Sequence, residues 1–118
     1  MKKILIVDDE QHMHLSIKSI LGKDYSFESA LTGTEAIQKL TEGIDLILCD
    51  VGLPDMDGIE VLKELEIRKL KIPCIMLTGF SFFEDKRLKS ETYGAADYIE
   101  KPIDNIQDFR TKIQKALA

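Results

Sequence analysis

The chain has 118 residues, a formal net charge of −5 and 44% apolar residues, which fits one globular domain over residues 1–118. The scattered lysines and arginines argue against nucleic-acid binding, which needs a concentrated basic patch. No apolar run approaches the ~20 residues of a membrane helix. Cys49 and Cys74 lie in apolar runs, and nothing in the sequence indicates a disulfide between them. We therefore expect a cytoplasmic protein.

The first part of the chain alternates short apolar runs with amphipathic stretches. The run Ile4–Val7 predicts a strand buried on both faces, and apolar side chains at helical spacing over residues 11–21 predict a helix. Alternation over Tyr25–Ser29 indicates a half-exposed edge strand. Thr32 and Glu35 have the spacing of a capping box, which predicts the start of the next helix.

The middle of the chain repeats this alternation. The run Leu46–Cys49 predicts a second buried strand that ends on Asp50. Asp57 and Glu60 again have capping-box spacing, ahead of an amphipathic helix. The run Cys74–Leu77 predicts a third buried strand.

The last part of the chain completes an α/β pattern. Residues 84–93 are expected to form a helix with a thin apolar face, and residues 96–99 are expected to form a short strand. The last helix is expected to place four apolar side chains on one face: Ile106, Phe109, Ile113 and Leu117. Strands that alternate with helices pair in parallel with right-handed crossovers. We therefore predict a doubly wound, flavodoxin-like (βα)5 fold with strand order 2-1-3-4-5 and helices on both faces, because this order centres the most apolar strands.

Polar side chains follow four of the predicted strands. Asp8 and Asp9 follow the first strand, Asp50 ends the third, Thr78 ends the fourth, and Lys101 lies just beyond the fifth. The carboxyl ends of parallel strands meet at one edge of a sheet, where ligands of such folds bind. One polar residue at a strand end would indicate only a solvated turn, but all of these together predict a common site.

This set of side chains has a chemical logic. Three neighbouring carboxylates repel one another and need a counter-charge, and Mg²⁺ prefers a few carboxylates plus water and phosphate oxygens. With such an ion bound, Asp50 is a suitable acceptor for a phosphoryl group. The Thr78 hydroxyl can donate to one phosphoryl oxygen and Lys101 can offset the charge on another. His12 and His14 lie two apart on a helix and point to different faces, so we interpret them as ordinary helix residues.

Four segments resemble the receiver domains of two-component response regulators. They are Ile4–Glu10, Asp50–Gly58, Leu77–Gly79 and Gly94–Pro102, and the likeness runs over essentially the whole chain. Each segment alone is a weak signal, but their combination in this order and spacing is highly specific.

The resemblance implies a function and a set of ligands. Asp50 would take a phosphoryl group from the phosphohistidine of a sensor histidine kinase or a histidine phosphotransfer protein. Asp8, Asp9, Asp50 and the backbone carbonyl of Gly52 would hold Mg²⁺. The domain would be a signalling switch that catalyses its own phosphorylation and dephosphorylation.

The resemblance also implies a conformational response. Thr78 and Lys101 would contact the phosphoryl group, the Lys101–Pro102 peptide bond would be cis, and Tyr98 would change rotamer as Thr78 moves inward. The surface formed by residues 84–93, 96–99 and 106–117 would then change its affinity for an output domain or a separate downstream protein.

Two departures and several alternatives remain. Gly52 and Phe80 occupy positions that vary in the family, and a glycine offers no side chain to orient an attacking water, so we hypothesise a long-lived phosphoryl group. A Mg²⁺-dependent phosphohydrolase of related architecture would need a second aspartate where Gly52 stands. A degenerate receiver used only for binding disagrees with the intact site residues, and a flavin carrier would need a phosphate-binding loop rich in Ser, Thr and Gly.

Overall fold

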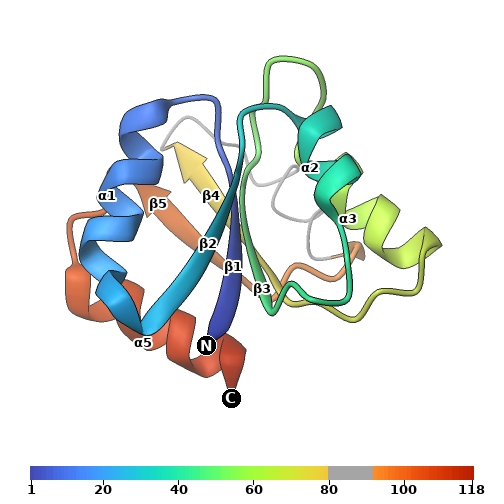
Figure 1. Cartoon of the computed structure of the whole chain (residues 1–118). Coiled ribbons are helices and arrows are strands. Elements are labelled where there is room, and N and C mark those ends of the chain that lie inside the picture. Colours follow the sequence, from blue (N-terminus) through green and yellow to red (C-terminus); the bar gives the residue numbers. More distant parts are fainter. Residues whose placement is uncertain (80–91) are drawn as a thin grey trace.

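The computed structural model describes residues 1–79 and 92–118, and these form one layer of sheet between helices (Figure 1). The sheet contains five parallel strands in the order β2-β1-β3-β4-β5. Their bounds are Lys2–Val7 for β1, Tyr25–Ala30 for β2, Leu46–Asp50 for β3, Cys74–Gly79 for β4 and Asp97–Lys101 for β5. The predicted parallel sheet and its strand order are confirmed.

Helices cover both faces of this sheet. In the described residues they are α1 (Gln11–Leu21), α2 (Gly33–Lys39), α3 (Ile59–Ile67) and α5 (Ile106–Leu117), with a short 3₁₀ turn at Gly22–Asp24. Helices α1 and α5 lie on one face, and α2 and α3 lie on the other (Figure 1). The helix expected at 84–93 falls almost wholly outside the described residues, and so does Phe80. No helix among the described residues is long and apolar enough to cross a membrane.

The core consists of two apolar clusters, one on each face of the sheet. Leu5 and Val7 of β1 point to the cluster beneath α2 and α3, whereas Ile4 and Ile6 point to the cluster beneath α1 and α5. This division follows from the period of two along a strand. Since full burial of one such side chain stabilises by about 1.5–3 kcal/mol, the central strands anchor the fold.

The two expected helix caps form differently. The Thr32 hydroxyl accepts from the Glu35 amide at 3.0 Å, while the Glu35 carboxylate accepts from the Leu31 amide at 2.7 Å, so α2 begins as predicted. The Asp57 carboxylate instead accepts from the amide of Ile59 at 3.1 Å. The capping-box interpretation of Asp57 is therefore wrong in detail, because the helix begins only at Ile59.

The C-terminal part also differs from the sequence-based expectation in two respects. Strand β5 begins at Asp97 and continues to Lys101, beyond the expected range 96–99. On α5, Phe109 and Ile113 are buried, but Ile106 is 46% exposed, because it starts the helix before the helix reaches the core.

Candidate functional site

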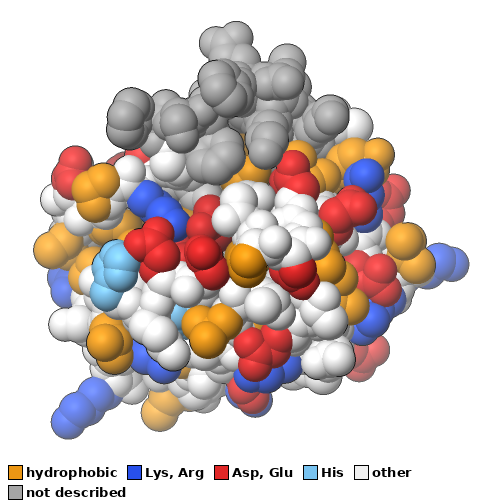
Figure 2. Space-filling view, turned by 90° about the horizontal axis from the view of Figure 1, so that it is seen from above, with side chains coloured by type: hydrophobic (Ala, Val, Ile, Leu, Met, Phe, Trp, Pro, Cys, Tyr) orange, Lys and Arg blue, Asp and Glu red, His pale blue; other side chains and the backbone are white. Residues whose placement is uncertain are grey.

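Two buried aspartates define the centre of the site. Asp8 directly follows β1 and Asp50 is the last residue of the adjacent strand β3, so the parallel register brings both carboxylates to one edge of the sheet. Asp8 is fully buried and Asp50 is 5% exposed. Figure 2 looks onto this edge and shows acidic side chains gathered beside a basic one. Such burial of two like charges requires a counter-charge.

Lys101 supplies part of that counter-charge from the end of β5. Its Nζ lies 3.0 Å from Oδ2 of Asp8, 3.0 Å from Oδ2 of Asp50 and 3.6 Å from Oε1 of Glu10. Burial lowers the pKa of Lys101, but the hydrogen bonds to Asp8 and Asp50 raise it by more than burial lowers it. The pKa of Lys101 is therefore above its usual value. Lys101 is therefore a permanent ammonium in this site.

One lysine does not neutralise the site. Burial raises the pKa of Asp50 above its usual value, and the hydrogen bond from Lys101 offsets this only in part. Asp9 and Glu10 add two more carboxylates next to Asp8. The site therefore favours a second cation, since an added positive charge relieves the repulsion among these carboxylates.

The acidic residues after β1 fit a hard divalent ion. Carboxylate oxygens of Asp8, Asp9 and Glu10 lie within 4.8 Å of one another. Such oxygens are the ligands that Mg²⁺ prefers, with water filling its other positions. Glu10 was not among the ligands inferred from the sequence, although its place directly after two aspartates was a usable signal.

The loop between β3 and α3 is fixed closely against Asp50. A Cβ on Gly58 would lie 2.2 Å from the carbonyl oxygen of Asp50, so only glycine fits there. The Gly58 amide donates to the Val51 carbonyl at 2.7 Å, and the Gly52 amide donates to Oδ1 of Asp50 at 3.1 Å. This loop therefore orients the Asp50 carboxylate directly.

Asp55 ties the far side of the same loop to α2. Its carboxylate accepts from the amides of Gly33 and Thr34, each at 2.9 Å, and from the Thr34 hydroxyl at 2.6 Å. The hydrogen bonds to Thr34 and Gly33 lower the pKa of Asp55 to about 2. The loop that carries Gly52 is thus held at Asp50 on one side and at α2 on the other.

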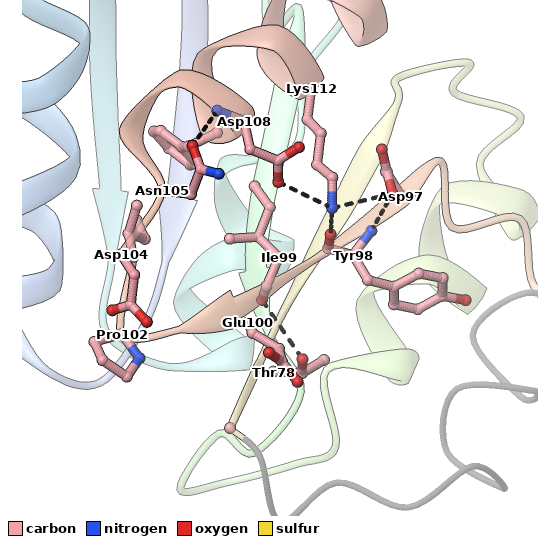
Figure 3. Close-up of a pocket in the computed structure, with 13 residues that line it drawn as sticks. Thr78, Asp97, Tyr98, Ile99, Glu100, Pro102, Asp104, Asn105, Asp108 and Lys112 are labelled. Atoms are coloured by element: carbon pink, nitrogen blue, oxygen red, sulfur yellow. Dashed lines mark hydrogen bonds and ion pairs between the residues drawn. The ribbon is translucent and has the colours of Figure 1, made fainter.

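Thr78 and Tyr98 lie beside this centre on β4 and β5. The Thr78 hydroxyl is directed at the carbonyl of Ile99 at 3.5 Å, the outer limit for a hydrogen bond. The side chain of Tyr98 is partly buried against the cluster beneath α2 and α3. In Figure 3 the ring of Tyr98 extends away from Lys112 and Asp108 of α5.

A pocket of about 460 Å³ lies between β5 and α5, and Thr78 contributes to its lining (Figure 3). Lys112 also lines this pocket, and its Nζ donates to the Tyr98 carbonyl at 2.7 Å. The same Nζ lies 3.9 Å from Oδ1 of Asp97 and 3.7 Å from Oδ2 of Asp108. The Lys101–Pro102 peptide bond beside it is cis.

His14 has a structural role near Asp8 that the sequence did not indicate. It is 2% exposed, its Nε2 lies 2.7 Å from the carbonyl oxygen of Asp8, and its Nδ1 lies 3.1 Å from the Ser29 hydroxyl. The expectation that His12 and His14 point to different faces of a helix is confirmed, since His14 is buried and His12 is exposed beside Glu10. The sequence did not predict the two hydrogen bonds of His14. Its spacing of three from the core residue Ile17 could have placed it on the buried face.

Comparison with known proteins agrees with this geometry. Residues 4–114 match the family described as the response regulator receiver domain. The chain is 46% identical over 103 residues to the alkaline phosphatase synthesis transcriptional regulatory protein PhoP of Bacillus subtilis, covering 86% of the chain and 42% of PhoP. It is 36% identical over 117 residues to the transcriptional regulatory protein ZraR of Escherichia coli, covering 98% of the chain and 26% of ZraR. The chain thus spans less than half the length of these relatives.

Solved structures show the same likeness. A CheY-like receiver domain protein from Methanospirillum hungatei superimposes with a TM-score of 0.84 at 38% identity, over 99% of this chain and 94% of that one. The signal receiver domain of a putative Luxo repressor protein from Vibrio parahaemolyticus gives a TM-score of 0.88 at 27% identity, over 98% and 89%.

Proposed function

Because this chain belongs to the response regulator receiver domain family, we propose that it accepts a phosphoryl group on Asp50 from a phosphohistidine donor. The observation that carries the proposal is the shared position of Lys101, whose ammonium holds both Asp50 and Asp8 at 3.0 Å. In this arrangement one oxygen of the acceptor is already paired with a cation. A sensor histidine kinase or a histidine phosphotransfer protein would be the donor.

The proposed transfer is a displacement at phosphorus. The bond between phosphorus and the donor imidazole nitrogen breaks as a bond to a carboxylate oxygen of Asp50 forms, and the imidazole leaves with the electron pair. Mg²⁺ held by Asp8, Asp9, Asp50 and the Gly52 carbonyl, with Glu10 nearby, would offset the charge of the phosphoryl oxygens. Lys101 would contact one phosphoryl oxygen, which stabilises charge where it develops.

Thr78 supports the second half of the proposal, the switch. Its 3.5 Å contact with the Ile99 carbonyl is weak, so a phosphoryl oxygen would be a better acceptor for the hydroxyl. Tyr98 directly precedes Ile99 on β5. Movement of Thr78 toward Asp50 would therefore favour another rotamer of Tyr98. The surface of β5 and α5 would then change its affinity for an output partner.

The relatives support an output that acts beyond this domain. PhoP and ZraR are named as transcriptional regulatory proteins, and this chain matches only 42% and 26% of their lengths. We therefore propose that the domain controls an attached output domain or a separate downstream protein. A cytoplasmic location follows from this proposal, because phosphohistidine donors of this kind act there.

The proposal also includes a slow loss of the phosphoryl group. Gly52, two residues after the acceptor, has no side chain to orient an attacking water. The phosphorylated domain alone should lose its phosphoryl group over minutes or longer, as measured by the mass of the intact protein. Decay within seconds would contradict this part.

The main test uses Mg²⁺ and acetyl phosphate, with the mass of the intact protein as readout. We expect a gain of one phosphoryl group, lost in Asp50→Asn and lost without Mg²⁺. The exposed Asp24→Asn is the matched control and should gain the group normally. Donor turnover without an adduct, abolished in Asp50→Asn, would instead indicate a phosphohydrolase, and no adduct on the folded protein, even with a phosphohistidine donor, would indicate a binding module.

A further inference from the structure

Both main-chain groups of Asp8 are held by specific hydrogen bonds. Its amide donates to the carbonyl of Ala30 on β2 at 3.1 Å. Its carbonyl accepts from Nε2 of His14 on α1 at 2.7 Å. This carbonyl belongs to the peptide that leads into Asp9, so the bond from His14 sets the direction in which the chain leaves β1.

The partners of His14 also define how its ring is used. A carbonyl oxygen can only accept, so Nε2 must carry the hydrogen of this bond. Nδ1 then accepts from the Ser29 hydroxyl at 3.1 Å when the ring is neutral. Ser29 precedes Ala30 on β2, and the single buried side chain therefore connects α1, the end of β1 and the end of β2.

The turn after β1 needs such a restraint. The carboxylates of Asp8, Asp9 and Glu10 lie within 4.8 Å of one another and repel before a cation arrives. Asp9 and Glu10 are exposed. Lys101 and His12 pair with the Glu10 carboxylate at 3.6 and 3.1 Å, but these side-chain contacts do not fix the peptide between Asp8 and Asp9. Within the turn, the Glu10 amide donates to Oδ1 of Asp8 at 2.9 Å, which orients the Asp8 side chain but not the peptide before Asp9.

We propose that His14 is a positioning residue of the divalent-cation site, which holds the Asp8–Asp9 peptide so that the carboxylates stay gathered before the ion binds. The proposal rests on the Mg²⁺ site of the proposed function, although it does not require that Asp50 be phosphorylated. Partners that orient metal ligands typically change metal affinity about 10- to 100-fold when removed. His14 acts here on the backbone between two ligands rather than on a ligand side chain.

A matched pair of variants isolates the hydrogen bond to Asp8. Gln and Met are unbranched side chains of similar length, but only Gln carries a donor that can reach the Asp8 carbonyl. The dissociation constant for Mg²⁺ alone is measured by calorimetry, and the free energy of unfolding is measured separately in metal-free buffer. We expect His14→Met to bind Mg²⁺ at least about 10-fold more weakly and His14→Gln to remain within about 3-fold of the unmodified protein.

Ser29→Ala provides a second, milder variant in case His14→Met does not fold. It removes only the bond to Nδ1, so the turn should bind Mg²⁺ nearly normally, whereas the double variant Ser29→Ala with His14→Asn should lose affinity because Asn is too short to reach the Asp8 carbonyl. Equal Mg²⁺ affinity in His14→Gln and His14→Met, with only stability changed, would overturn the proposal. So would equal losses in Ser29→Ala and in the double variant, or no Mg²⁺ binding by the unmodified protein. None of these outcomes depends on phosphoryl transfer.

Discussion

The edge at Asp8 and Asp50 and the side of the sheet at β5 and α5 are built in opposite ways. At the first, polar groups are buried and joined by several contacts of 3.0 Å or less, centred on Lys101. At the second, the ion pairs are longer, with Lys112 at 3.7 and 3.9 Å from its two carboxylates, and Thr78 lies 3.5 Å from its acceptor. The one short bond of Lys112, at 2.7 Å, goes to the main-chain carbonyl of Tyr98 and not to a charged group. Longer contacts are weaker, so replacing them with other contacts costs little free energy.

This difference suits a switch. Phosphoryl transfer depends on groups held in position beforehand, whereas a change of partner affinity needs an element with two arrangements of similar free energy. We therefore expect the loss of the cation or of the close packing at the Asp8–Asp50 edge to lower stability and phosphoryl uptake strongly, and equivalent substitutions on the β5–α5 side to have smaller effects.

The largest contrast should be between the two lysines. Lys101→Met leaves Asp8 and Asp50 without their shared counter-charge, so we expect an unfolding free energy lower by about 1–3 kcal/mol in metal-free buffer and phosphoryl uptake slower by about 100-fold. Lys112→Met removes two longer, partly exposed ion pairs and one hydrogen bond to the Tyr98 carbonyl. It should cost about 1 kcal/mol, less than Lys101→Met, because no buried carboxylate loses its counter-charge. Denaturant unfolding and adduct formation from acetyl phosphate measure both, and equal effects of the two variants would contradict the contrast.

A second test places one methyl group against the acceptor. Gly58→Ala would bring a Cβ to 2.2 Å from the Asp50 carbonyl oxygen and 3.0 Å from Cα of Val51. We expect a loss of about 1–3 kcal/mol from this overpacking, together with slower phosphoryl uptake. Gly43→Ala is the control, because its Cβ would meet only the Thr41 hydroxyl at 3.6 Å. A Gly58→Ala protein as stable as Gly43→Ala would show that the loop at Asp50 is not rigid.

The pH dependence of Asp50 gives a smaller effect of defined sign. Burial raises the pKa of Asp50 in the folded state, so the folded protein holds this proton more tightly than the unfolded chain does. The associated stability is fully present below the ordinary value of 3.8 and is lost as pH rises through the raised pKa. Near neutral pH and without metal, Asp50→Asn should therefore be more stable than the unmodified protein, on the order of 1 kcal/mol.

Denaturant unfolding of both proteins between acidic and neutral pH measures this difference, and saturating Mg²⁺ should reduce it by stabilising the unmodified protein. If Asp50→Asn is less stable than the unmodified protein throughout, then Lys101 fully compensates the buried charge and the proposed need for a second cation is wrong.

The smallest stability effect is expected at Thr78. Thr78→Ala removes only the 3.5 Å contact with the Ile99 carbonyl and should cost no more than about 1 kcal/mol. Phosphoryl uptake should persist, but the response of the Tyr98 ring signals in NMR spectra on phosphorylation should shrink, and Thr78→Ser should restore it. An undiminished Tyr98 response in Thr78→Ala would show that Tyr98 responds to phosphorylation independently of Thr78.

The fold was predictable because it depends on apolar pattern. The runs Ile4–Val7, Leu46–Cys49 and Cys74–Leu77 have no polar side chain on either face, which only a central strand covered on both sides accommodates. The meeting of Asp8, Asp50 and Lys101 was predictable for a related reason, since parallel strands end at a common edge. These conclusions needed only the order of elements along the chain.

The apolar pattern along the chain is therefore enough to predict the sheet, its strand order and the residues that end its strands. Three features depend on how the elements pack and could not be predicted from that pattern. His14 meets the Asp8 carbonyl and the Ser29 hydroxyl, Asp55 accepts from the first amides of α2, and Ile106 remains exposed. The physical reason is that a hydrogen bond between separate elements depends on strand register and helix position to within an ångström or less. Burial pattern specifies which face of an element is covered, but not which polar atom lies opposite another.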